Sequence, residues 1–180
     1  MSRGLFVFLA LLLPVTASAA PAPSIDVLLN ALAHADSPVA ARAIEDQIDQ
    51  LWSQSGSPSA DLLLQRAEDA SDKDDYDTAS QILVKLTEAQ PGFAEAWHLR
   101  AGISAAKQDF HDAMLSLQRT LVLQPRHFGA LAELGGILEE FGDKEHALAA
   151  YRKAIALDPY LEDVPDRIRA LSRDLEGQGI

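Results

Sequence analysis

The sequence predicts an all-α protein built from stacked helical hairpins, and three observations support this fold class. Alanine and leucine dominate while β-branched residues are sparse, and that mix favours helix over strand. Pro91, Pro125 and Pro159 are each separated by 34 residues. Each interval holds two apolar-periodic stretches separated by a polar turn, which is the pattern of a helical hairpin that stacks on its neighbours to bury a core.

The turn between the two helices of a unit occurs three times in one register. It reads DDYDTA at residues 74–79, QDFHDA at 108–113 and GDKEHA at 142–147. In the second unit we expect one helix from about Phe93 to Ala106 and the next from about Asp109 to Leu123, because Pro125 cannot continue a helix. The same interval relates Ala79, Ala113 and Ala147; Asp75, Asp109 and Asp143; and Leu83, Leu117 and Tyr151.

These residues resemble the tetratricopeptide repeat (TPR) family. With each proline at repeat position 32, the repeats begin at Ala60, Ala94 and Phe128, and position 20 is alanine in all three. The resemblance implies a right-handed solenoid of helical hairpins. Other family positions are occupied by Trp97 at 4, Leu134-Gly135 at 7 and 8, Tyr151 at 24 and Ala154 at 27. Departures from the family pattern are Arg66-Ala67 and Arg100-Ala101 in place of Leu-Gly, Leu86 and Thr120 at 27, and the lack of tyrosine at 11.

The chain is expected to contain four segments. They are an export signal at 1–19, a degenerate N-terminal hairpin that caps the stack at 20–58, three repeats at 59–160 (about 60–93, 94–127 and 128–161), and a C-terminal capping helix with its tail at 161–180. An apolar stripe on the second helix of the N-terminal hairpin comprises Ile44, Ile48, Leu51 and Trp52. The last helix, from about Asp163 to Leu175, carries mainly charged residues outside its apolar positions, as a helix that closes an open stack must.

The N-terminus has the pattern of a signal peptide. Arg3 precedes the apolar run LFVFLALLL, and Pro14 is followed by small residues. Cleavage between Ala19 and Ala20 fits better than cleavage after Ala20, which would leave Pro21 at the new N-terminus. We therefore expect a periplasmic protein. An uncleaved anchor in the inner membrane is the alternative, although the apolar run is far shorter than the roughly 20 residues that span a bilayer.

The net charge limits the class of partner, and the cysteine content limits the covalent modifications. The formal net charge is −12, and loss of Arg3 with the signal would make it −13. This charge disfavours nucleic acid and anionic membrane surfaces, so membrane contact is expected only if the signal stays uncleaved. Cysteine is absent, which excludes disulfides and a lipid-modified cysteine.

No motif indicates catalysis, a cofactor, a small-molecule substrate or a bound metal. SDKDDYD (71–77) has four aspartates, but a calcium loop needs an oxygen ligand at its fifth position, glycine at the sixth and glutamate at the twelfth. Counted from Asp72, those positions hold Tyr76, Asp77 and Leu83. In the repeat register the segment is a turn, with Asp75 as a helix cap and Asp74 in the left-handed conformation. The histidines form no i,i+4 pair and have no cysteines to complete a zinc set.

The resemblance also implies a concave groove lined by the first helix of each repeat. Small residues leave its middle open, and acidic residues make its ends negative. Chaperone-binding members hold a C-terminal carboxylate with lysine and asparagine, where this chain has Leu64 and Glu68. The candidate partner-binding residues are Asp61, Leu64, Glu68, Asp72, Glu95, His98, Gly102, Ala132, Gly136, Glu139 and Glu140. We expect a protein or peptide partner with lysine or arginine. The alternative is that the small residues only ease the packing of helices and the acidic residues only keep the protein soluble.

The sequence thus predicts a non-enzymatic periplasmic adaptor that binds a protein through an acidic concave groove. The alternative is a structural or self-associating component of an envelope complex that uses its convex face or its terminal helices. An enzyme or a cell-wall-binding module is a third hypothesis, and no motif favours it.

Overall fold

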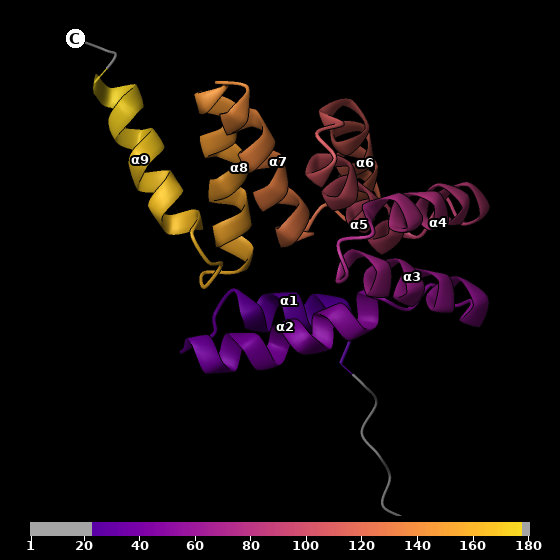
Figure 1. The fold of residues 1–180 in the computed structure, drawn as a ribbon. Coiled ribbons are helices and arrows are strands. Elements are labelled where there is room, and N and C mark those ends of the chain that lie inside the picture. Colours follow the sequence, from indigo (N-terminus) through magenta and orange to yellow (C-terminus); the bar gives the residue numbers. More distant parts are fainter. Residues whose placement is uncertain (1–22, 178–180) are drawn as a thin grey trace, which may run out of the picture.

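The computed structural model describes residues 23–177, and within that range every regular element is a helix (Figure 1). The predicted all-α class is confirmed, whereas the predicted export signal lies outside the described residues. No helix of the described range is long and apolar enough to cross a membrane. The helices are α1 Ile25–Leu32, α2 Pro38–Trp52, α3 Pro58–Ser71, α4 Tyr76–Ala89, α5 Ala94–Ala106, α6 Phe110–Leu123, α7 Phe128–Glu140, α8 Lys144–Leu157 and α9 Val164–Gly177.

Helices α3 to α8 form three successive hairpins, and α9 packs on α8. Each inter-helix turn contains one residue with positive φ at the same register position: Asp74 (57°), Gln108 (63°) and Gly142 (78°). The next residue is an aspartate whose side chain accepts a hydrogen bond from the third backbone N–H of the following helix. The repeated turn therefore works as predicted, as a left-handed helix end followed by an aspartate cap.

The aspartates of SDKDDYD are used separately. Asp74 accepts a hydrogen bond from the Tyr76 hydroxyl at 2.8 Å, and Asp75 caps α4 through the Thr78 N–H at 3.1 Å. Asp77 instead pairs with Lys107 of the next repeat at 2.6 Å. Their carboxylates point to different partners, which agrees with interpreting the segment as a turn rather than a calcium loop.

The core between helices depends on small residues at fixed repeat positions. Ala79, Ala113 and Ala147 are fully buried. In the third hairpin, Gly135 lets the Tyr151 ring of α8 lie directly against α7. A Cβ atom at Gly135 would approach the Cδ1 and Cε1 atoms of that ring to 2.7 Å, which is closer than carbon atoms can pack. The Leu-Gly pair of this repeat therefore permits close contact between two helices.

Replacing Gly135 with alanine should lower the free energy of unfolding by about 1–2 kcal/mol. Overpacking of this kind costs about 1–3 kcal/mol, and the better helix propensity of alanine returns at most about 1 kcal/mol. Gly102→Ala is the matched control, because its nearest neighbour would be Glu133 Oε1 at 3.8 Å. Chemical denaturation should show Gly102→Ala equal to or more stable than wild type. Equal effects of the two substitutions would contradict this account of Gly135.

A cap at the N-terminal end of the stack would pack on α3. The N-terminal hairpin does not lie there. Figure 1 shows α1 and α2 lying across the ends of α7 and α8. Phe128 at the start of α7 belongs to the hydrophobic cluster of this hairpin, and the partly buried Leu157 and Leu161 pack against it. The predicted apolar stripe of α2 is confirmed, since Ile48 and Trp52 are buried. Its partner surface is the third repeat, which is far away in the sequence.

Polar contacts reinforce this attachment. Arg126, in the loop before α7, pairs with Asp26 of α1 at 3.3 Å and donates to Asn30 Oδ1 at 2.7 Å. The Tyr160 hydroxyl donates to the Ala35 carbonyl at 3.3 Å. The hairpin is thus fixed along loops that connect one repeat to the next, and it borders the side on which α5 and α7 begin.

Candidate partner-binding surface

The predicted groove residues lie on three helices that pack side by side, α3, α5 and α7. Leu64 is 1% exposed and belongs to the hydrophobic core, so its side chain is not available to a partner. Asp72 and Glu140 are exposed at the C-terminal ends of α3 and α7. Asp61, Glu68, Glu95, His98, Gly102, Ala132, Gly136 and Glu139 are partly buried. The surface offered by this set is therefore smaller than the predicted list.

Glu95 and His98, on the first turns of α5, belong to a network of hydrogen bonds. His98 donates from Nδ1 to Glu95 Oε1 and from Nε2 to Glu133 Oε1 of α7, both at 3.1 Å. His127, the N-cap residue of α7, donates from Nε2 to Glu95 Oε2 at 3.1 Å. Its Nδ1 accepts from the Ala130 N–H at 3.2 Å. The network connects the first turns of two neighbouring repeats.

The geometry determines where the charges lie. Burial alone would lower the pKa of His98, but its hydrogen bonds to Glu133 and Glu95 outweigh burial and raise the pKa to about 10. Burial would raise the pKa of Glu95, yet the hydrogen bonds from His127 and His98 hold this pKa well below its usual range. Burial lowers the pKa of His127, with the bond to Glu95 opposing it. His98 is therefore an imidazolium between two carboxylates, and His127 is neutral.

Two further carboxylates lie near this network and form no ion pair within the described residues. Asp49 on α2 is exposed, yet partial desolvation by its neighbours raises its pKa, and the nearby Glu95 adds to the shift. Burial and Glu95 also raise the pKa of Glu68 on α3, with Asp72, Asp69 and Asp49 contributing. Helix α2 thus adds its own acid to the surface formed by α3 and α5. Such crowding of carboxylates favours a cation placed among them.

Glu139 and Glu140, at the C-terminal end of α7, have different surroundings. Glu139 accepts hydrogen bonds from the Tyr151 hydroxyl and from Arg167 of α9, both at 3.0 Å. Burial and the bond to Glu139 raise the pKa of Tyr151 to about 12. Glu139 therefore holds α9 against the third repeat, whereas Glu140 is exposed. Of the two predicted residues, Glu140 is the one whose charge is open to a partner.

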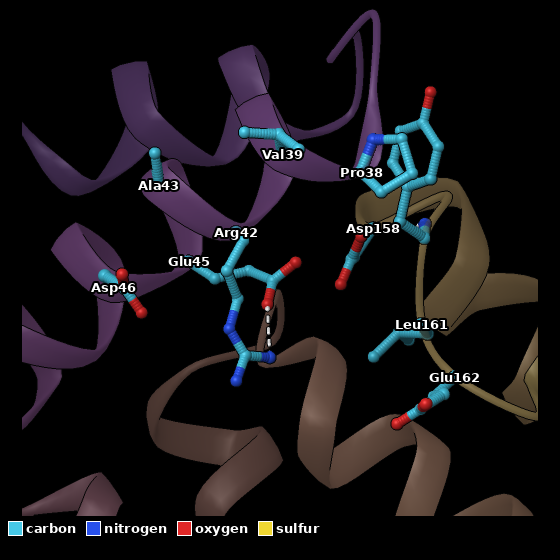
Figure 2. A pocket seen from close by; sticks show the side chains of 10 residues that line it. Pro38, Val39, Arg42, Ala43, Glu45, Asp46, Asp158, Leu161 and Glu162 are labelled. Carbon is cyan, nitrogen blue, oxygen red and sulfur yellow. Dashed lines mark hydrogen bonds and ion pairs between the residues drawn. The ribbon is translucent and has the colours of Figure 1, made fainter.

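An acidic cavity lies between the N-terminal hairpin and the loop after α8. Figure 2 shows the side chains of α2 on one wall and those of Asp158, Leu161 and Glu162 on the other. Its volume is about 710 Å³, and Arg42 pairs with Glu45 across 3.7 Å. Burial raises the pKa of Asp158, and burial together with Asp158 raises that of Glu45. Acidic side chains therefore line both sides of the hairpin.

Trp52, His127 and Glu133 were absent from the sequence-predicted site. Trp52 stacks on His127 with ring centroids 4.1 Å apart and an interplanar angle of 18°. The docking of α1–α2 on the third repeat has no local signal in the sequence. His98 and His127 could be paired only through the repeat register, which places them at repeat positions 5 and 34 of the same unit.

Comparison with known proteins agrees with the TPR resemblance. A family model described as tetratricopeptide repeat matches residues 128–160. The chain thus contains a tetratricopeptide repeat and has the fold of TPR proteins. The matched residues coincide with the repeat that agrees best with the family positions. A TPR repeat-containing protein of Rhizobium etli is 28% identical over 161 residues, which cover 89% of this chain and 79% of that protein.

Solved TPR structures share the fold. The first TPR of Spaghetti (RPAP3) bound to an HSP90 peptide has a TM-score of 0.62 at 20% identity, over 65% of this chain and 93% of that one. The Sgt2 TPR domain from Aspergillus fumigatus has a TM-score of 0.61 at 20% identity, over 67% and 81%. A structure of MamA has a TM-score of 0.60 at 18% identity, over 83% and 81%. The predicted TPR solenoid is therefore confirmed.

Proposed function

We propose that this TPR protein is a non-enzymatic periplasmic adaptor that binds a basic segment of a protein partner on the surface formed by α3, α5 and α7. The observation that carries the proposal is the crowding of carboxylates there. Glu68 and Asp49 lie near Glu95, and partial desolvation and neighbouring acids raise the pKa of both. A lysine or arginine side chain from a partner would supply the missing positive charge.

The same charges disfavour a partner that presents a carboxylate. The Spaghetti TPR structure is bound to the HSP90 peptide SRMEEVD, which is acidic and ends in a carboxylate. In this chain the positions that hold such a carboxylate in chaperone-binding members are Leu64, which is buried, and Glu68. We therefore expect discrimination against acidic C-terminal peptides by like-charge repulsion.

The periplasmic part of the proposal depends on the N-terminal sequence. The export pattern consists of Arg3, the apolar run 5–13 and the small residues before Ala20. Fractionation of cells that express the full chain tests it. We expect a shortened protein beginning near Ala20 in the periplasmic fraction. Recovery of uncleaved protein in the cytoplasm would contradict export.

Charge reversal on the proposed surface should release the partner. Glu68→Lys together with Glu140→Lys changes two acids whose carboxylates form no hydrogen bond or ion pair within the described residues, so we expect the fold to be kept. We expect at least a tenfold loss of partner recovered by crosslinked capture from an envelope extract, since like charges across an interface cost several kcal/mol. Glu139 is left unchanged because its carboxylate holds Tyr151 and Arg167. The matched control is Glu88→Lys on α4, an exposed residue. Equal recovery with all three proteins would refute the surface.

One observation favours a structural role as the second candidate function. Leu115 and Val122 of α6 are 51% and 64% exposed, and they border an apolar cavity of about 440 Å³ with Met114, Leu121 and Leu134. Exposed apolar residues clustered on one helix can support self-association. Sedimentation at several protein concentrations separates the two functions. A stable oligomer that Leu115→Asp dissolves would support the structural role, and a monomer at every concentration would exclude self-association.

A further inference from the structure

We propose that Glu95, His98 and His127 form a binding site for a divalent transition metal ion, with Zn²⁺ as the best match. One ligand atom from each of the three side chains lies within 4.8 Å of the other two. Glu95 and His98 lie on α5 and His127 is the N-cap residue of α7, so an ion here would connect α5 directly to the start of α7. The site shares Glu95 and His98 with the proposed partner surface, but it would take a metal ion from solution rather than a side chain of a partner.

The donor atoms suit such an ion. Glu95 presents Oε1 toward His98 Nδ1 and Oε2 toward His127 Nε2, with both distances 3.1 Å. Both histidine nitrogens thus converge on one carboxylate. Two imidazole nitrogens and a carboxylate are a ligand set that Zn²⁺ and its neighbours accept in proteins. A bound ion would lie among the three side chains and replace the proton on His98 Nδ1, which is released to solvent, while the proton of His127 moves within its ring.

The surroundings orient the ligands. Glu133 Oε1 accepts from His98 Nε2 at 3.1 Å, which leaves Nδ1 as the nitrogen facing Glu95. A carboxylate behind a ligating histidine is a common arrangement in metal sites. The His127 ring is 2% exposed and is held by stacking on Trp52. Asp49 and Glu68 lie nearby and make the region negative.

One contact must change when the ion binds. His127 Nδ1 accepts the Ala130 N–H, so the neutral ring carries its proton on Nε2. For Nε2 to ligate a metal, that proton must move to Nδ1 and the bond to Ala130 must break. Ion binding is therefore expected to weaken the N-terminal cap of α7. The amide resonance of Ala130 should shift accordingly, which gives a local signature that nonspecific binding would not produce.

The test uses Co²⁺ and Zn²⁺ on the untagged full-length protein carrying Trp97→Phe. This substitution leaves Trp52 as the remaining tryptophan, since the chain has two. Because Trp52 stacks on His127, we expect Co²⁺ to quench its fluorescence saturably at one equivalent, and Zn²⁺ to displace the Co²⁺. The Ala130 amide should shift over the same titration. Glu133→Gln should weaken binding by about tenfold, as removal of an outer carboxylate does.

Variants decide whether the ion is held by these residues. His98→Asn should abolish saturable quenching. His127→Asn should abolish it too, and it retains the α7 cap because asparagine is a good N-cap residue. Circular dichroism confirms that each variant is folded. His146→Asn removes an exposed histidine paired with Asp143 and should bind Co²⁺ as the parent protein does. Absence of saturable 1:1 binding, or equal binding by His98→Asn and the parent, would overturn the site.

Discussion

Replacing Trp52 with alanine is expected to release the N-terminal hairpin from the third repeat. Trp52 is 6% exposed, and it stacks on His127 and lies 5.3 Å from the Phe128 ring. Removal of a buried tryptophan side chain costs about 3–5 kcal/mol through lost burial and the cavity that remains. The loss should fall mainly on the attachment of α1–α2, because this cluster joins the hairpin to α7 and α8.

Hydrogen exchange measures that loss where it occurs. In Trp52→Ala, backbone amides of α1 and α2 should lose protection, while those of α5 and α6 keep most of theirs. Val39→Ala is the control on the same helix, since Val39 is 81% exposed and its truncation should change stability by less than about 0.5 kcal/mol. Unchanged protection of α1 and α2 in Trp52→Ala would show that the hairpin is held by something other than this aromatic cluster.

Replacing Glu95 with alanine is the second change with a large expected effect. Glu95 accepts from both His98 and His127, and its side chain is 18% exposed. Breaking a buried ion pair costs about 3–5 kcal/mol when one charge is left without its partner. Because Glu133 still pairs with His98, we expect a loss near the lower limit, about 3 kcal/mol. Urea denaturation of the wild type and the variant gives this difference.

Two variants isolate the cause. Glu95→Gln keeps the shape and one acceptor oxygen, so it should lose clearly less stability than Glu95→Ala. Glu88→Ala truncates an exposed glutamate and should stay within about 0.5 kcal/mol of wild type. If Glu95→Ala were no less stable than Glu88→Ala, the network would contribute nothing to the fold. Its hydrogen bonds would then be incidental to packing of α5 on α7.

The repeats were predictable because their determinants are local and recur. Asp75 could be assigned as a cap and Asp74 as a left-handed residue from the register alone, and both assignments are confirmed. One departure from the family pattern is compensated by other side chains. Arg100, in place of the usual leucine, pairs with Asp112 and lies 5.3 Å from the Trp97 ring centroid. Its polar partner comes from the next helix, so the sequence pattern around Arg100 alone could not show it.

The docking of the N-terminal hairpin could not be predicted, for a physical reason. An apolar stripe such as that of Ile48 and Trp52 shows that a helix buries one face but not which surface covers it. The choice of the third repeat depends on residues about 75 positions away, including His127 and Phe128. The details of the candidate site could not be predicted for the same reason, since the partners of Glu95 and the burial of Leu64 follow from tertiary contacts.

Peptide selection on the purified protein tests the central claim most directly. A random peptide library displayed on phage is selected on the wild type and on Glu68→Lys/Glu140→Lys. If the acidic surface of α3, α5 and α7 binds a basic segment, the wild type will enrich peptides rich in lysine and arginine. Synthetic versions of those peptides will then bind the variant at least tenfold more weakly. Enrichment of peptides that end in an acidic C-terminal sequence, or equal affinity for both proteins, would contradict the account.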